Sequence, residues 1–160
     1  MDGLIGGWRL AGINTMTSGV PVTFVYTPSA AAVVSGIAQD FRGANNYRPN
    51  VVCDPTTDRT STTAYFNASC VIAPTDPSQP FGNAPRNSVR APWFWQLDAS
   101  LTKQLALCSR AKLEVRLEAF NILNRTNLQA PNSNRSSGGF GTITSTYDAR
   151  QLQLGAKLLW

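Results

Sequence analysis

The sequence predicts an all-β fold, an antiparallel meander of about four to five amphipathic strands with long loops. Three stretches, about 93–104, 111–123 and 147–160, alternate apolar and polar residues with the two-residue period of a strand that has one apolar face. A fourth segment, about 7–26, is strand-like with one interruption. Charged residues make up only 14% of the chain, which suits strands with one apolar and one polar face.

The C-terminal strand has the clearest alternation. Its apolar face is formed by Leu152, Leu154, Ala156, Leu158 and Trp160, and its polar face by Gln151, Gln153, Gly155 and Lys157. An aromatic residue that closes such a strand is typical of a membrane–water interface. We therefore expect the apolar face to meet lipid and the polar face to meet a lumen.

The stretch from Trp93 alternates in the same way. Trp93 and Trp95 begin its apolar side, and with Trp8 and Trp160 they predict an aromatic girdle. Gln96 and Asp98 belong to its polar side and are expected to face the lumen.

The 111–123 segment has two interpretations. As a strand it places Lys112, Glu114, Arg116 and Glu118 on the lumen-facing side, where they can form ion pairs. Leu113, Leu117 and Phe120 also keep helical spacing, and the composition suits a helix. Val115 would lie on the polar side of that helix, so we favour the strand.

The segment 7–26 is interrupted at Thr17-Ser-Gly19, which allows a hairpin there or one long strand with a bulge; we favour the single strand. Residues 28–92 contain eight of the ten prolines and predict a long outer loop, and the region 124–146 predicts a second. No apolar run approaches the roughly 20 residues of a membrane-spanning helix.

Cys53 and Cys70 lie in the Pro- and Thr-rich stretch, so a disulfide between them is plausible in an oxidising compartment, with two free thiols as the alternative. Cys108 is expected to be a lone thiol near a turn.

No residues predict catalysis, a cofactor site or a metal site. The chain has no His, which removes a Ser–His pair and any credible zinc site, and it has no Gly-rich phosphate loop between a strand and a helix. The net charge of +5 is spread along the chain. Arg86, Arg90, Trp93 and Trp95 are the only candidates for a nucleic-acid surface, so we expect no nucleic-acid partner and no enzyme.

Several motifs occur in order along nearly the whole chain. They are Gly6-Gly-Trp-Arg-Leu-Ala-Gly-Ile13, Ser18-Gly-Val-Pro21, Tyr47-Arg-Pro-Asn50, Phe81-Gly-Asn-Ala-Pro-Arg-Asn87, Glu118-Ala-Phe-Asn-Ile-Leu-Asn124 and Phe140-Gly-Thr-Ile143. With these motifs the chain resembles the C-terminal β-barrel segment of a TonB-dependent receptor, of the Oar-like kind that carries a carboxypeptidase-regulatory-like domain. The pattern Gln153, Gly155, Leu158, Trp160 resembles the C-terminal signal that the barrel-assembly machinery reads.

The resemblance implies a partial barrel in the bacterial outer membrane, with residues 1–160 as the C-terminal part of the barrel domain. Such receptors are 22-stranded barrels with an N-terminal plug, on which the TonB protein pulls to admit a siderophore, vitamin, carbohydrate or peptide-type ligand. The implied partners are outer-membrane lipid, the assembly machinery, the rest of the barrel and the plug.

The sequence contains neither plug nor TonB-interacting box, and its N-terminus lacks the features of a secretion signal. Four or five strands cannot close a barrel, so we expect a segment of a longer protein. The alternative is a soluble secreted β-sandwich that binds a glycan or protein through aromatic residues, namely Tyr47, Tyr65, Trp93 and Trp95.

Overall fold

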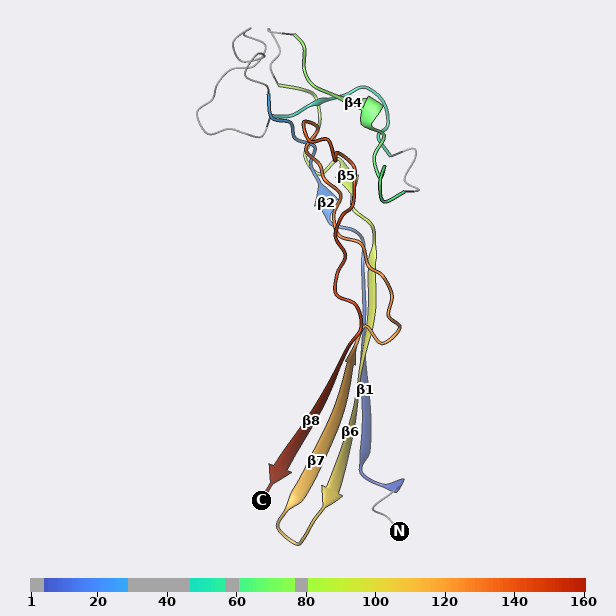
Figure 1. The fold of residues 1–160 in the computed structure, drawn as a ribbon, viewed down its shortest axis with the longest axis vertical. Helices are drawn as coiled ribbons and strands as arrows, with labels where there is room; N and C mark the ends of the chain where they lie inside the picture. The colour runs from blue at the N-terminus through green and yellow to red at the C-terminus, as the bar shows by residue number, and fades with distance from the viewer. Residues whose placement is uncertain (1–4, 29–46, 57–60, 77–80) are drawn as a thin grey trace. The chain divides into compact units, whose positions relative to one another are not determined.

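The chain folds into two compact units. The structure, a computed structural model, describes residues 5–28, 47–56, 61–76 and 81–160 (Figure 1). The sheet unit comprises Met1–Thr17, Trp93–Asn127 and Thr146–Trp160, and the loop unit comprises Ser18–Pro92 and Leu128–Ser145. In the described ranges no helix is long and apolar enough to cross a membrane.

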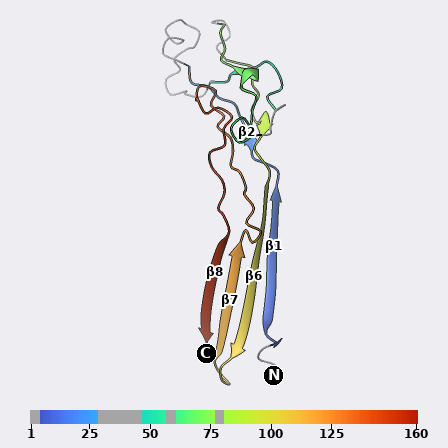
Figure 2. The same ribbon diagram turned by 45° about the vertical axis from the view of Figure 1, so that its right-hand side comes forward.

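The sheet unit is one antiparallel meander of four strands in the order β1-β6-β7-β8 (Figure 2). The strands are β1 Trp8–Thr17, β6 Phe94–Ala106, β7 Lys112–Phe120 and β8 Gln151–Leu159. They contain 10, 13, 9 and 9 residues, close to the roughly 9–11 that a membrane-spanning strand needs. The predicted all-β meander is confirmed, and within the described residues the sheet does not close.

The segment 111–123 forms a strand, not a helix. β7 pairs with β6 on one side, from Lys112 to Ala119, and with β8 on the other, from Lys112 to Phe120. Two neighbouring strands satisfy its backbone, and this pairing outweighs the helix propensity of its residues. β7 ends where Asn121 takes a left-handed conformation with φ of 52°.

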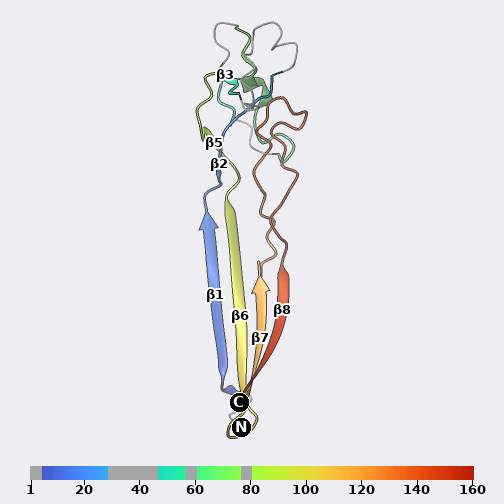
Figure 3. The same cartoon turned by 90° about the vertical axis from the view of Figure 1, so that its left-hand side faces the viewer.

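The expected single strand over 7–26 is wrong in extent, because β1 ends at Thr17. The chain pairs again only at β2, Pro21–Val22, whose partner is β5, Val89–Arg90 (Figure 3). A hairpin at Ser18–Gly19 is also excluded, since β1 pairs with β6 and not with β2.

The break between β1 and β2 has a local cause. A Cβ on Gly19 would lie 1.8 Å from the carbonyl oxygen of Ala91, so only glycine allows this close approach. Pro92, next to Ala91, has no N–H to donate to a ladder. The strand pairing therefore cannot continue in regular form through these residues.

The loop unit, which includes most of the segment predicted as a long loop, has a core of its own. The core cluster contains Val22, Phe24, Phe66, Val71, Ala84, Val89, Ala91 and Phe140. Phe24 and Phe66 meet edge to face with ring centroids 4.9 Å apart. A short ladder joins β3, Asn50–Val51, to β4, Val71–Ile72, and a 3-10 turn, Ala68–Cys70, precedes β4.

Candidate functional site

The register of the sheet unit separates an apolar face from a polar face. Residues that pair directly project to the same side of a sheet. The apolar face contains Leu10, Met16, Trp95, Leu97, Leu101, Leu105, Leu113, Val115, Leu117, Leu152, Leu154, Ala156 and Leu158. It is open to its surroundings, since Leu10 is 76% and Leu154 74% exposed. A β-sandwich would bury this face against a second sheet, which the described residues do not supply.

The residues predicted to face a lumen lie together on the opposite face. The register places Gln96 and Asp98 of β6 on the same side as Lys112, Glu114, Arg116 and Glu118 of β7. Arg116 binds two carboxylates, with Nη2 3.1 Å from Glu114 Oε1 and Nη1 3.6 Å from Glu118 Oε1. Gln104 donates from Nε2 to Glu114 Oε2 at 3.0 Å. The four β7 residues Lys112, Glu114, Arg116 and Glu118 therefore form a charged ladder, a row of polar side chains that water can reach.

The predicted assembly signal spans both faces of the terminal strand. Gln153 and Gly155 pair with Glu118 and Arg116 and so belong to the polar face, whereas Leu158 pairs with Leu113 on the apolar face. A Cβ on Gly155 would meet no atom within 4 Å. Gly155 contributes to a shallow hollow of about 330 Å³ that Glu114, Arg116 and Glu118 also line. Trp160 follows β8 and is 92% exposed.

The four tryptophans lie near the two ends of the sheet. Trp93 directly precedes β6 and Trp95 is its second residue. Both therefore lie at the opposite end of β6 from the short turn that leads to β7. Trp8 pairs with Lys103 near the turn, and Trp160 follows the end of β8, which pairs with Lys112. In outer-membrane barrels short turns are inside and long connections are outside. By this rule we expect Trp93 and Trp95 to mark the outer end of the sheet, and Trp8 and Trp160 the inner end.

A lysine on the apolar face was not predicted. Lys103 pairs with Val115 and is only 8% exposed. Its Nζ donates to the carbonyl oxygen of Gly6 and lies 4.8 Å from the centroid of the Trp8 ring. A lysine at the inner end of a strand can direct its charge to the interface in this way.

Two buried asparagines after β7 were also missed. Asn127 accepts from the Trp95 N–H at 3.1 Å and donates from Nδ2 to the Trp95 carbonyl at 2.8 Å. Asn121 donates through its backbone N–H to Asp98 Oδ1 at 2.8 Å, and its side chain bonds both the N–H and the carbonyl of Arg125. These amides fasten the segment after β7 to the outer end of β6.

Arg125 lies on the tryptophans of the outer end. Its guanidinium carbon is 4.2 Å from the ring centroid of Trp93 and 5.4 Å from that of Trp95. The indole N–H of Trp95 donates to Asn14 Oδ1 at 2.6 Å. Nothing in the alternating pattern indicated this contact, because Arg125 lies outside the periodic stretches.

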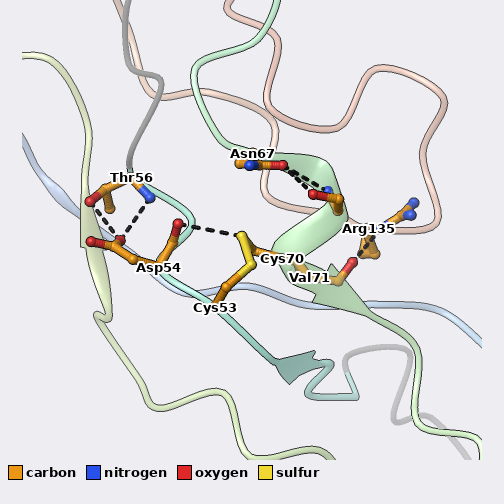
Figure 4. Close-up of a disulfide and its surroundings, with 8 residues drawn as sticks. Cys53, Asp54, Thr56, Asn67, Cys70, Val71 and Arg135 are labelled. Carbon is orange, nitrogen blue, oxygen red and sulfur yellow. Dashed lines mark hydrogen bonds between the residues drawn. A yellow bond between two sulfur atoms is a disulfide. The ribbon is translucent and has the colours of Figure 1, made fainter.

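The cysteines occupy different environments. Cys53 and Cys70 form a disulfide in the loop unit, with Cα atoms 4.8 Å apart (Figure 4). Beside it, Asp54 accepts hydrogen bonds from the N–H and Oγ1 of Thr56, and Arg135 donates to the Val71 carbonyl. Cys108 is an exposed free thiol in the turn between β6 and β7. Hydrogen bonds from the backbone N–H groups of Arg110 and Ala111 lower the pKa of this thiol.

The possible nucleic-acid residues are divided between the two units. Arg90 donates to the Gly19 carbonyl at 3.2 Å in the loop unit, together with Arg86, whereas Trp93 and Trp95 belong to the sheet unit. Among the described residues no group of three or more His, Cys, Asp or Glu side chains could hold a metal ion.

Comparison with known families identifies the class of protein. Residues 1–153 match the family model of the outer membrane beta barrel domain. The chain therefore belongs to this family, and it is a protein of the bacterial outer membrane. The soluble β-sandwich is thereby ruled out. No curated protein and no solved structure matches the chain.

Proposed function

We propose that this chain forms the C-terminal barrel wall of a TonB-dependent transporter. The observation that carries the proposal is the charged ladder of Glu114, Arg116 and Glu118 on the face opposite the apolar one. Charged side chains in the middle of a membrane-spanning strand are costly where they face lipid, and they are tolerated where they face a water-filled interior. The ordered motifs by which the chain resembles TonB-dependent receptors favour an actively driven transporter over a passive pore.

In this proposal the segment contributes a wall and ligand-facing loops, not catalysis. In the described part of the sheet, β1 and β8 each have a partner strand on one side only. Unpaired edges cannot face lipid, so they would pair with further strands of the same barrel. The plug within that barrel would be the part on which TonB acts. The ligand would be of the siderophore, vitamin, carbohydrate or peptide type.

Uptake measurements test the proposal. Cells producing the full-length protein are given labelled ligands from these four classes, with and without the TonB motor. We expect uptake of one class that stops when the motor is deleted or the proton gradient is dissipated. Uptake that persists in the de-energised cells would identify a passive channel and overturn the proposal.

The barrel-assembly machinery is proposed to read Gln153, Gly155, Leu158 and Trp160. Deletion of Trp160 should then reduce the amount of assembled protein in the outer membrane several-fold. A Gln151→Ala variant changes the same strand outside the signal and serves as the control. Equal amounts of assembled wild-type and Trp160-deleted protein would rule out a role of Trp160 as a signal.

A further inference from the structure

A permanent positive charge lies at the outer end of the lipid-facing side. Trp95 is on the apolar face, and Trp93 precedes β6 with the same alternation. The guanidinium of Arg125 lies over both rings, at 4.2 and 5.4 Å from their centroids. Arginine remains charged at any physiological pH, so this end of the face carries a cation where it meets the headgroup layer.

This cation has no counter-ion among the described residues. The ion pairs there involve Arg116 with Glu114 and Glu118, and none involves Arg125. Nε of Arg125 is buried without a hydrogen-bond partner among the described residues. Charged donors of this kind are usually matched by an acceptor. Here the acceptor must come from outside the described chain.

The cation is also held in place before any ligand arrives. The side chain of Asn121 bonds the backbone of Arg125 at 2.9 and 3.0 Å, and Asn127 bonds the backbone of Trp95. Asn14 fixes the Trp95 ring through its indole N–H. Binding would therefore cost little ordering of side chains.

The location determines which acceptors are present. The outer leaflet of a bacterial outer membrane is built of glycolipid whose sugar headgroup carries phosphate. A guanidinium binds phosphate oxygens in a two-pronged manner, and a tryptophan face accommodates a sugar ring or acyl chain beside it. We propose that Arg125, supported by Trp93 and Trp95, binds a phosphate group on the headgroup of an outer-leaflet glycolipid. The inference rests on the outer-membrane location and not on the transported ligand.

The test uses the full-length protein in neutral detergent micelles. Binding of the phosphorylated glycolipid is measured by native mass spectrometry, beside the same lipid after removal of its phosphates. Arg125→Gln should weaken binding roughly tenfold or more, the effect of one charge-assisted hydrogen bond. Arg110→Gln is the matched control, because it removes the same charge at the short turn and should leave binding unchanged.

Each outcome has a definite meaning. Preference for the phosphorylated lipid that is lost in Arg125→Gln and kept in Arg110→Gln supports the proposal. Equal binding by Arg125→Gln and wild type would make Arg125 a structural anchor of the loop only, and equal loss in both variants would reveal a general charge effect. Either result overturns the proposal, as does displacement of the lipid by an equal concentration of inorganic phosphate.

A second variant covers the case in which Arg125→Gln does not assemble. Arg125→Lys keeps the charge but not the planar two-pronged donor, so we expect weaker binding than in wild type with a retained preference for the phosphorylated lipid. Indifference of both wild type and Arg125→Lys to removal of the phosphates would overturn the proposal.

Discussion

At the scale of single residues, asparagine side chains take the place of a missing strand. After β7 ends, the amide of Asn127 presents one acceptor and one donor to the backbone of Trp95, as a paired strand would. Asn127 is only 3% exposed, so water does not replace these bonds. The outer end of β6 is thus satisfied without regular pairing.

Replacing Asn127 should expose this dependence. Asn127→Ala leaves the N–H and carbonyl of Trp95 without their partner, and we expect a loss of about 1–3 kcal/mol in the free energy of unfolding. Urea unfolding of the full-length protein in micelles, followed by tryptophan fluorescence, measures the loss. Thr126→Ala changes an exposed neighbour and should stay within about 0.5 kcal/mol of wild type. Equal stabilities of the two variants would contradict the role assigned to Asn127.

At the scale of elements, alternation decides which side of each strand meets lipid. Leu154 and Gln153 are neighbours in the middle of β8, yet they pair with Leu117 and Glu118 on opposite faces of β7. A charge placed at one position or at the other should therefore have different effects although the sequence distance is one residue.

The arginine pair Leu154→Arg and Gln153→Arg tests the assignment of faces. Leu154→Arg places a charge against the acyl chains and should cost about 2–4 kcal/mol, whereas Gln153→Arg meets water and the Glu118 carboxylate and should cost little. Folding of the full-length protein into lipid vesicles, followed by urea titration, measures both. If Gln153→Arg is the more damaging variant, the two faces have been assigned the wrong way round.

The same periodicity explains what the sequence could predict. The grouping of Gln96 and Asp98 on the same face as the charged residues of β7 follows from strict alternation in β6 and β7, and the register keeps that alternation across the sheet. The end of β1 at Thr17 depends on the close approach of Gly19 to Ala91, which are far apart in sequence. The core around Phe24 and Phe66 likewise joins residues that are far apart in sequence. Contacts of this kind leave no local pattern to read.

At the scale of the whole molecule, the short turn and the long connections define two sides of the membrane. The turn carries the free thiol of Cys108, whose pKa is lowered by the backbone N–H groups of Arg110 and Ala111. Lowering the pKa increases the thiolate fraction at neutral pH, so we expect this thiol to react faster there than an ordinary exposed cysteine. We therefore expect Cys108 to report on the inner side of the membrane.

Labelling in cells should reveal this orientation. A maleimide that cannot cross the outer membrane should leave Cys108 unlabelled in intact cells and label it once the membrane is permeabilised. Thr144→Cys in a Cys108→Ser background places a thiol in the loop unit and should be labelled in both conditions. Labelling of Cys108 in intact cells would mean that the turn lies outside, and the inner and outer ends of the sheet would be exchanged.

The two units should also respond differently to loss of the disulfide. Cys53 and Cys70 are separated by 17 residues, and a bridge over such a loop contributes about 3 kcal/mol by restricting the unfolded chain. Because the bridge and the core around Phe66 both belong to the loop unit, Cys53→Ala/Cys70→Ala should make that unit at least tenfold more sensitive to protease added to intact cells. The sheet unit should remain as a protected membrane fragment, detected by mass spectrometry, and reduction of the wild-type protein should give the same fragment. Loss of the sheet unit along with the loop unit would show that the barrel wall depends on the loop core for its stability.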